Sequence, residues 1–542
     1  SFLIHPSAMS DPEKSETSLP AAPEQALVCH QSSPNDSSGS ESPDLEKGMR
    51  QEVVKKPAHS RHISITLDDL EAQTKSDLPL KRFAYLRYAM FTMYRRLFTI
   101  VFLVNLACFI YVMVADRQIL ALVNATAVNL VACGLARHPM VVNGIYRVVC
   151  SLPRSAPLFL RRMAAKAAHY GGVHSGCGTA SLIWYAGFVG VASKLYWTSS
   201  PISTVTDRTF STAPIAVSYV ILALLLVMIV VAYPVFRRKM HDYFELTHRF
   251  TSWLILALFI VLVFLFANDM GCAEEKSLGY ALITLPAFWL LIGAVVAIAH
   301  PWVLLRKIPV QTDPLSPHAI RLHFSHAPIS FAKGIQVSKH PLKDWHSFAG
   351  FPDPSESLEN IRRIPSNQPS PTKPPVAYKK GHKRNQESWS VVVSKAGDWT
   401  SDTIKSPPTH VWKRGALMRG VGYGMRLFNR IIVVTTGSGI GPCLGFLGDE
   451  RRPMIKVVWQ TRNPLRTYGQ GVIDLVHQMG PDPIILDTST DGRVDMLPII
   501  HQQVQEFQAD AVFVISNPPI TRKIVYEFES HGIPAYGPIF DS

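Results

Sequence analysis

The most prominent pattern along the 542-residue chain is a change from polar to apolar sequence near Leu97. Residues 1–80 are polar, rich in Ser and interrupted by Pro, and hold too little apolar surface to offset the entropy of ordering. We therefore predict a disordered cytosolic tail over this stretch. Long apolar runs follow, each close to the ~20 residues that a helix needs to cross a bilayer. They cover 97–115, 119–136, 175–193, 214–234, 250–267 and 279–299.

These runs predict a bundle of six transmembrane helices within residues 81–300. An even number of spans places both ends of the chain on one side of the membrane. The segments on that side hold 17 Lys and Arg residues, whereas the opposite segments hold four. The positive-inside rule therefore places both termini in the cytosol. The shorter apolar stretch 139–153 is interrupted by Arg147, and we expect an interfacial segment or a packed loop there.

The pattern changes again after Pro301. Short alternating segments at 318–324, 333–339 and 388–397 are typical of β-strands. Between them, the Pro-rich and basic interval 352–387 predicts a disordered insert. From residue 430 onward, β-branched apolar runs alternate with helical or loop segments, which predicts a parallel sheet buried on both faces. The predicted strands of this sheet lie within 431–436, 454–461, 483–489 and 510–516.

Composition supports a membrane protein. The net charge is +14, yet 47% of the residues are hydrophobic, a combination that fits basic cytosolic flanks rather than a soluble nucleic-acid binder. We therefore expect the lipid bilayer, and no nucleic acid, among the partners. The seven cysteines show neither paired spacing nor a CxxC pattern, so we expect no disulfide framework and no zinc site, and the four in apolar stretches predict buried thiols.

A glycine-rich turn follows the first strand of the predicted parallel sheet and precedes a predicted helix. Glycines let the backbone approach a pyrophosphate, and amides at a helix start supply donors and the positive end of the helix dipole. In this context the turn predicts a dinucleotide site, although an ordinary strand–turn–helix has the same appearance. Its candidate residues are Thr436, Gly437, Ser438, Gly439, Ile440, Gly441 and Pro442.

The next strand is followed by Arg462 and Asn463, where the adenosine ribose of a bound dinucleotide would lie. No acidic residue stands at this strand end, and an arginine there favours a 2′-phosphate. We therefore expect NADPH rather than NADH. A solvated surface arginine is the alternative interpretation.

The order of these parts resembles the ferric reductase and NADPH oxidase superfamily, and most closely the fungal integral membrane proteins of the TmpA type. The strings HYGGVHSGCG, WHSFAGFPDP and TTGSGIGPCLGFLGDE carry the resemblance. It implies a cytosolic module resembling ferredoxin–NADP reductase, with an FAD-binding β-barrel over 301–429 and a Rossmann-like α/β NAD(P)-binding domain over 430–542. It also implies a location in the plasma membrane.

The flavin motif of the superfamily is His-Pro-Phe followed by Ser or Thr. The matching stretch here keeps the His and the Phe but lacks the Pro and the final hydroxyl, and a Ser replaces the superfamily's cysteine near the nicotinamide. The resemblance implies that the cofactor-binding residues outside the glycine turn are Trp345, His346, Ser347, Phe348, Gly397, Trp399, Thr400, Ser516, Asn517 and Pro518.

Two histidines, His174 and His248, lie near the cytosolic ends of the third and fifth predicted spans. Ionisable residues at membrane depth suggest function by default, and imidazole nitrogens suit haem iron. The strings around both residues resemble the haem-ligating regions of the superfamily. Hydrogen bonding at a helix end is the alternative interpretation, and His169 and His241 are alternative ligands.

The superfamily normally places a second histidine 13 or 14 residues further along each of these helices. Those positions hold Gly187 or Phe188 in one helix and Val261 or Leu262 in the other, and none of these residues can bind iron. Two stacked haems are therefore not expected, and transmembrane electron transfer is less favoured than in the relatives.

The leading hypothesis is a membrane-bound oxidoreductase that passes electrons from NADPH through FAD, with a haem as a further station, to an acceptor that the sequence does not identify. No side chain stands out as an acid or a base, so we predict no catalytic residue. The alternative is a non-catalytic membrane signalling protein that retains a degenerate reductase fold. The departures from the flavin and haem motifs motivate that alternative.

Overall fold

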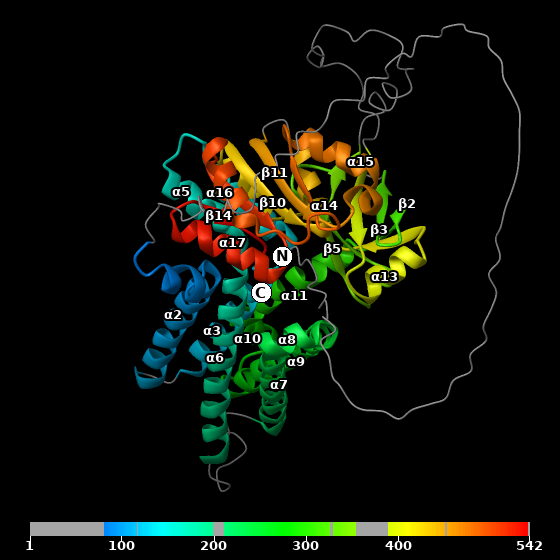
Figure 1. Cartoon of the computed structure of the whole chain (residues 1–542). Helices are drawn as coiled ribbons and strands as arrows, with labels where there is room; N and C mark the ends of the chain where they lie inside the picture. Colours follow the sequence, from blue (N-terminus) through cyan, green and yellow to red (C-terminus); the bar gives the residue numbers. More distant parts are fainter. Residues whose placement is uncertain are drawn as a thin grey trace, which may run out of the picture. The chain divides into compact units, whose positions relative to one another are not determined.

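The structure is a computed structural model that describes residues 81–115, 118–198, 211–325, 329–353, 388–449 and 452–539. The predicted tail over 1–80 and most of the predicted insert, 354–387, lie outside the described residues. Figure 1 shows a helical N-terminal region, which is followed along the chain by β-strands and then by a mixed α/β segment.

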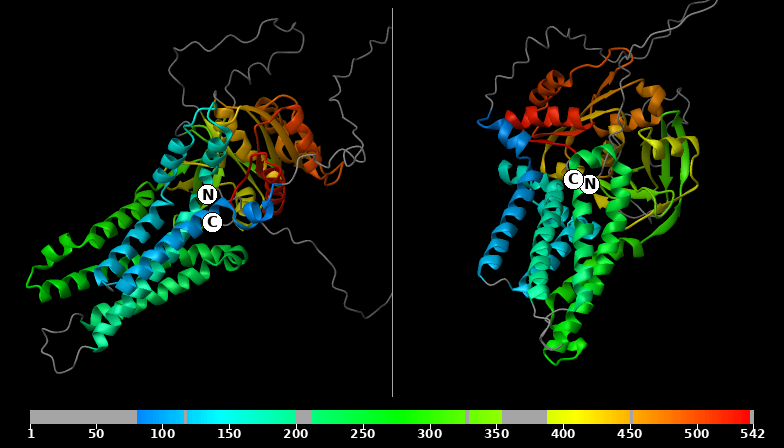
Figure 2. Two further views of the ribbon diagram at one scale, coloured as in Figure 1. Left: turned by 90° about the vertical axis from the view of Figure 1, so that its left-hand side faces the viewer. Right: turned by 90° about the horizontal axis from the view of Figure 1, so that it is seen from below.

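Each apolar run predicted from the sequence lies in helix. The helices of these runs are α2 (Met93–Ala115), α3 (Ile119–Leu135), α6 (Gly171–Thr198), α7 (Thr212–Val231), α9 (His241–Ala273), α10 (Leu278–Thr284) and α11 (Pro286–Val303). Shorter segments lie between and before them, namely η1 (Tyr85–Met90), α4 (Pro139–Val149), α5 (Leu158–Ala165), η2 (Lys166–Tyr170) and α8 (Pro234–Lys239). Figure 2 shows the long helices running beside one another from two further directions.

Among the described residues, four helices are long and apolar enough to cross a membrane: α2, α7, α9 and α11. The pair α3 and α4 passes the same test together, but it bends by 75° at the break, so the total is four or five. This is fewer than the six spans predicted. The sixth predicted run is also broken, because Leu285 has extended backbone and Pro286 starts a new helix.

Helix α6 is the predicted span that fails the test, although it is 28 residues long. It packs against α2, α3 and α7 and holds many of the buried residues of the bundle. A Cβ at Gly172 would lie 2.3 Å from the Tyr94 carbonyl oxygen of α2, so small residues are required where these helices meet. Asn105 of α2 accepts hydrogen bonds from Trp184 of α6 and Asn129 of α3, at 2.9 and 2.8 Å.

Two antiparallel sheets follow the helices. The first has the order β1–β8–β4–β5, with β9 also paired to β4, and the second has the order β2–β3–β7–β6. Apolar side chains of both sheets form one core, as a barrel-like domain requires. The three strands predicted from the sequence are confirmed as β3, β4 and β7. The strands are β1 (Arg306–Pro309), β2 (Gln311–Ser316), β3 (Ala319–Phe324), β4 (Lys333–Ser338), β5 (His346–Ala349), β6 (Phe351–Pro352), β7 (Trp389–Ser394), β8 (His410–Lys413) and β9 (Met418–Arg419).

The third sheet is parallel and has the order β12–β11–β10–β13–β14. The predicted parallel sheet is therefore confirmed. Alternate residues of β10 enter two cores: Ile431 and Val433 face α14 and α15, whereas Ile432 and Val434 face α16 and α17. The strands are β10 (Arg430–Thr436), β11 (Met454–Thr461), β12 (Ile484–Asp487), β13 (Ala511–Ile515) and β14 (Ala535–Tyr536). The helical segments are α13 (Asp398–Lys405), η4 (Val421–Leu427), η5 (Gly437–Gly439), α14 (Ile440–Leu444), η6 (Gly445–Gly448), α15 (Pro464–Met479), α16 (Met496–Glu506) and α17 (Pro518–Ser530).

The stretch around 139–153 is a helix for most of its length, not a loop. Helix α4 buries Val142 and Tyr146, and together with α5 and η2 it shares a hydrophobic core with β10 and β11. An ion cluster reinforces this contact. The carboxylate of Glu529, at the end of α17, is 2% exposed and lies 3.0 Å from Lys166 Nζ and 3.2 Å from Arg162 Nη2. The short helices of the helical region are thereby joined to the parallel sheet.

We predict that Glu529→Gln lowers the free energy of unfolding by about 3–5 kcal/mol, because it leaves two largely buried cations without their anion. The measurement is thermal denaturation of the full chain in detergent. Lys523→Gln is the matched control, since it removes an exposed ion pair with Asp495 and should change stability by less than about 0.5 kcal/mol. Equal stability of the two variants would contradict the role assigned to Glu529.

Candidate functional site

The glycine turn occupies the carboxyl end of β10, the central strand of the parallel sheet. Gly437 has φ +49°, and no atom lies within 4 Å of the position that a Cβ would take there. The Trp459 indole of the neighbouring strand donates a hydrogen bond to the Gly437 carbonyl oxygen at 3.0 Å. Thr436, Gly437 and Ser438 are half-buried, so this part of the turn has an open side.

Gly439 packs closely against the neighbouring strand β13. A Cβ at this position would lie 2.3 Å from the Ile515 carbonyl oxygen of β13 and 2.5 Å from Thr435 Oγ1. Thr435 Oγ1 donates to that same carbonyl at 2.8 Å. The glycine is therefore required for the packing of the turn against β13, whatever ligand the turn binds. Ile440 and Gly441 are also buried, and Gly441 lies against Val392 of β7.

Ser516 and Asn517, which follow β13, lie beside the turn. The Ser516 and Thr436 hydroxyls form a hydrogen bond, so the two candidate segments meet. Asn517 instead caps α17, because its Oδ1 accepts from the Ile520 amide at 3.0 Å, and Pro518 occupies the first turn of that helix. Thr436 and Ser516 therefore join the two candidate segments, whereas Asn517 and Pro518 form the start of α17.

Arg462 is exposed directly beyond the end of β11. The next residue, Asn463, has φ +45°, and its amide donates to Asp487 Oδ1 at 2.8 Å. Asp487 ends the neighbouring strand β12 opposite Thr461, a placement that sequence reasoning missed. Burial opposes ionisation of Asp487, but hydrogen bonds from Ser489 and Asn463 prevail and lower its pKa. This carboxylate thus holds the turn that presents Arg462.

The predicted flavin strand is β5. His346 and Phe348 lie on the same face, and both rings pack against Trp399, with centroids at 4.4 and 5.7 Å. Ser347 pairs with Gln336 of β4. Trp345 is buried, and its indole donates to the Pro341 carbonyl oxygen at 3.0 Å. The three aromatic rings of His346, Phe348 and Trp399 therefore form one stack beside the strand.

The helix start at Gly397 is partly occupied by its own chain. Thr400 Oγ1 accepts from the amides of Ala396 and Gly397, at 2.8 and 2.9 Å. These amides are thus used within the turn rather than offered to a phosphate. Open space remains around Gly397, since a Cβ there would meet no atom within 4 Å. The indole nitrogen of Trp399 is buried without a hydrogen-bond partner among the described residues.

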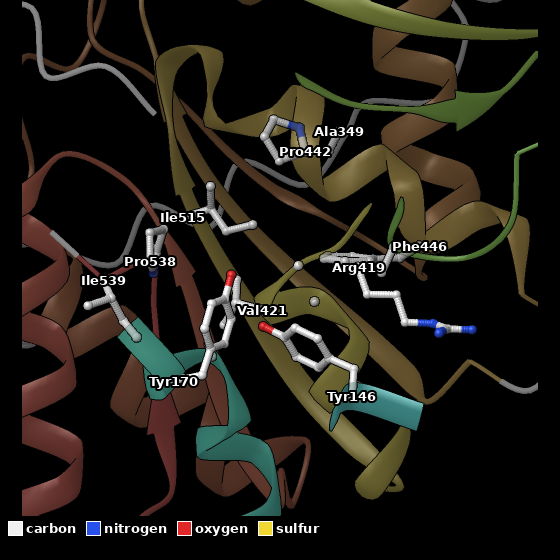
Figure 3. Close-up of a pocket in the computed structure, with 14 residues that line it drawn as sticks. Tyr146, Tyr170, Ala349, Arg419, Val421, Pro442, Phe446, Ile515, Pro538 and Ile539 are labelled. Atoms are coloured by element: carbon white, nitrogen blue, oxygen red, sulfur yellow. The ribbon is translucent and has the colours of Figure 1, made fainter. Parts of the chain in front are cut away.

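A partly open cavity lies where the antiparallel sheets, the parallel sheet and the helical region meet. Ala349, the last residue of β5, lines it together with Pro442 of the glycine turn and Ile515 of β13. Figure 3 shows that Tyr146 and Tyr170 also reach the cavity, with their hydroxyl ends turned toward it. Arg419, Val421, Phe446 and Ile539 complete much of its wall. Strand β5, which the sequence predicted as the flavin strand, and the glycine turn therefore line the same cavity.

His174 and His248 face each other across α6 and α9, with ring centroids 6.3 Å apart. His174 Nδ1 lies 2.9 Å from the Cys133 carbonyl oxygen and must donate to it, which leaves Nε2 without a proton. His248 Nδ1 is buried and has no hydrogen-bond partner among the described residues. The alternative histidines are placed differently: His169 Nδ1 bonds the Lys166 carbonyl, and His241 pairs with Asp242. Within the described residues no cluster of three or more His, Cys, Asp or Glu forms a metal site.

The family model and the curated proteins that this chain resembles are named as reductases. The family model described as adenylate-forming reductase 03009, C-terminal domain, matches residues 421–542. Adenylate-forming reductase 03009 of Coprinopsis cinerea is 38% identical over 458 residues, which is 84% of this chain and 41% of the relative. Adenylate-forming reductase 06235 of the same fungus is 37% identical over 459 residues, with the same coverage of 84% and 41%. The chain thus spans about two fifths of the length of these curated relatives.

Solved structures with similar parts are distant. Ferredoxin-NADP+ reductase from Plasmodium falciparum has a TM-score of 0.29 at 11% identity and covers 43% of this chain and 94% of its own. The ferredoxin reductase in carbazole 1,9a-dioxygenase has a TM-score of 0.28 at 11% identity and covers 44% and 70%. Full-length CYP116B46 from Tepidiphilus thermophilus has a TM-score of 0.32 at 13% identity and covers 44% and 29%. At these scores the alignments establish no shared function.

We predict that Gly439→Ala destabilises the chain by about 1–3 kcal/mol, because the new methyl group must displace backbone of β13. In Gly437→Ala the new methyl group points into open space. This substitution should therefore lower the free energy of unfolding only by the ~1–2 kcal/mol that an alanine with positive φ costs. Gly471→Ala, at an exposed and unobstructed site on α15, is the control and should be neutral or slightly stabilising. Thermal unfolding of the full chain in detergent measures all three. A Gly439→Ala variant as stable as the control would show that the turn does not need this close approach.

Proposed function

We propose that this chain is an NAD(P)H-dependent reductase module that uses a flavin and is attached to a membrane through its helical region. One observation carries the proposal: Ala349 of the flavin strand, Pro442 of the glycine turn and Ile515 of β13 line the same cavity. A nicotinamide from one side and a flavin ring from the other would meet there. The reductase names of the relatives from Coprinopsis cinerea agree with this class of reaction.

The nucleotide is proposed to lie over the carboxyl end of β10. The half-buried backbone at Gly437 and Ser438 supplies amides for the pyrophosphate, and the Thr436 and Ser516 hydroxyls lie beside it. Gly439, Ile440 and Gly441 are buried, and the two glycines pack the turn against β13 and β7. Arg462 stands exposed where a 2′-phosphate would lie, which favours NADPH over NADH.

The flavin, proposed to be FAD, is assigned to β5 and the start of α13. The cavity at Ala349, the open space at Gly397 and the unpartnered Trp399 indole fit a flat ring with a nucleotide tail. When bound, a flavin accepts hydride as a pair of electrons and releases them singly. The residues of the chain bind the flavin, orient it and shield it from water. His346 and Phe348 fix Trp399 by stacking, and the apolar side chains of Phe446 and Ile539 form part of the shielding wall.

The helical region is proposed to cross the membrane six times, with both termini in the cytosol and the plasma membrane as its location. This count adds α6 and the α3–α4 pair to the four apolar helices, and the Lys and Arg bias along the sequence sets the orientation. The residue ranges 81–300, 301–429 and 430–542 are the corresponding membrane, flavin and nucleotide domains.

A single haem between His174 and His248 is proposed as an electron station. His174 and His248 would hold the iron, because their rings face each other with centroids 6.3 Å apart and the hydrogen bond from His174 to the Cys133 carbonyl leaves its other ring nitrogen available as a ligand. A haem held there would take up and pass on single electrons. The acceptor that finally takes the electrons is not identified.

The second candidate function is a non-catalytic membrane signalling protein with a reductase fold. The specific observation in its favour is that Thr400 takes two amides at the start of α13 that a flavin phosphate would need. The two candidates differ in one measurable property, since only the reductase binds and turns over redox cofactors.

We predict that the purified chain in detergent is yellow and that NADPH bleaches its flavin absorbance. Ser438→Asp should slow the bleaching about tenfold or more at limiting NADPH, because a carboxylate at the open side of the turn repels the pyrophosphate. Ser438→Ala is the control and should resemble the unaltered chain. A chain that stays colourless after incubation with FAD and ignores NADPH would favour the signalling protein.

A further prediction concerns nucleotide choice. Arg462→Ala should raise the KM for NADPH about 10-fold or more and leave the KM for NADH unchanged, because only NADPH offers a 2′-phosphate to the guanidinium. Lys456→Ala, near the opposite end of the same strand, serves as the control and should alter neither value. An equal change in the KM for both nucleotides in Arg462→Ala would show that Arg462 does not contact the 2′-phosphate.

A further inference from the structure

The cavity shared by the flavin strand and the glycine turn is closed in part by residues of the helical region. Tyr146 comes from α4, and Ala168 and Tyr170 come from η2, whereas the other lining residues lie beyond residue 330. The module following the helices thus does not enclose the site by itself. The helical region has a role here that anchoring to a membrane does not require.

Among these residues, Tyr146 is the one whose position suggests a contact with a ligand. Its side chain belongs to the buried core, at 2% exposure, and its ring packs edge-on against Tyr423 at 6.1 Å. The hydroxyl points into the cavity (Figure 3), and no hydrogen bond joins it to any described residue. The hydroxyl of Tyr185, another buried tyrosine, is bonded to the Ser218 carbonyl at 3.3 Å. The Tyr146 hydroxyl instead opens onto the cavity, where a ligand can accept its hydrogen bond.

The position of Tyr146 is fixed by contacts one turn earlier on the same helix. Asn143 Nδ2 donates to the Leu417 carbonyl at 2.9 Å, and Asn143 Oδ1 accepts from the Arg419 amide at 2.8 Å. Arg419 Nη1 in turn donates to the Asn143 carbonyl at 3.0 Å. These three bonds tie α4 to the segment that carries β9, at the edge of the cavity. The phenol is thus pre-positioned rather than loosely placed.

We propose that the Tyr146 hydroxyl donates a hydrogen bond to a carbonyl oxygen of the flavin ring held in this cavity, so that the helical region completes the redox site. The inference rests on the proposed function. A neutral phenol is a donor at physiological pH. Negative charge gathers on the ring carbonyls when the ring takes up electrons, and a hydrogen bond to a charged acceptor is stronger than one to a neutral acceptor. Tyr146 therefore stabilises the reduced ring more than the oxidised ring.

The test is the midpoint potential of the bound flavin in the full chain in detergent. Tyr146→Phe should shift the reduction equilibrium about tenfold toward the oxidised ring, which is a fall of ~30 mV for a two-electron couple. Flavin content should be unchanged, because the ring stack and the cavity wall remain. Asn143→Ala should lower the potential in the same direction, since it releases α4 while the hydroxyl itself is kept.

Tyr536→Phe is the matched control. Tyr536 is a buried tyrosine whose hydroxyl lacks a partner among the described residues, and it does not line the cavity. Its substitution should leave the potential unchanged. A flavin whose potential is the same with Tyr146 or Phe at this position would overturn the inference and leave the proposed function standing. A chain that binds no flavin at all would overturn both.

Discussion

The site depends on one steric constraint: the turn after β10 must pass within van der Waals contact of the end of β13. Only glycine permits this at position 439, because the Ile515 carbonyl occupies the space of a side chain. The close approach brings the Thr436 and Ser516 hydroxyls together and places Pro442 and Ile515 on one cavity wall. The open backbone at Gly437 is then presented outward by the same turn. Gly439 is thus needed for packing, whereas the proposed pyrophosphate contact is assigned to the backbone at Gly437.

A second set of contacts connects this site to the helical region. The bonds between Asn143 and the β9 segment hold α4 at the cavity, and the Glu529 carboxylate binds Arg162 and Lys166 behind the parallel sheet. Such contacts are polar and largely buried, so their geometry is specific and their loss is costly. The proposed reductase is therefore a composite structure, in which the short helices of the membrane-proximal region contribute to the redox site as well as to attachment.

The sequence predicted those features that depend on local pattern. Apolar runs located the long helices, and β-branched runs located β10, β11 and β13 to within a residue or two. By length and composition four or five of the six predicted spans are apolar enough to cross a membrane, and α6, which carries small residues where its neighbours approach, is not among them. The strand–turn–helix around the glycines was predicted correctly, but the obstacle at Gly439 was not foreseen, since it comes from β13, some 75 residues later.

Other site features depend on contacts that no local pattern encodes. The stretch containing Tyr146 was expected to be interfacial or a packed loop, and nothing in its sequence indicates that its hydroxyl faces a cavity beside Ala349 and Pro442. The Thr400 hydroxyl was assigned to a phosphate-binding segment, yet it binds the amides of its own turn. The Asp487 carboxylate reaches the Asn463 amide only because β11 and β12 are paired.

Amide hydrogen exchange of the full chain in detergent, with and without NADP+ and FAD, tests the central claim most directly. The account predicts that NADP+ slows exchange at the amides of residues 437–441, and that FAD slows exchange around the cavity, including the segment of α4 that carries Tyr146. Exchange at the glycine turn that is unchanged by NADP+ at saturating concentration would contradict the account.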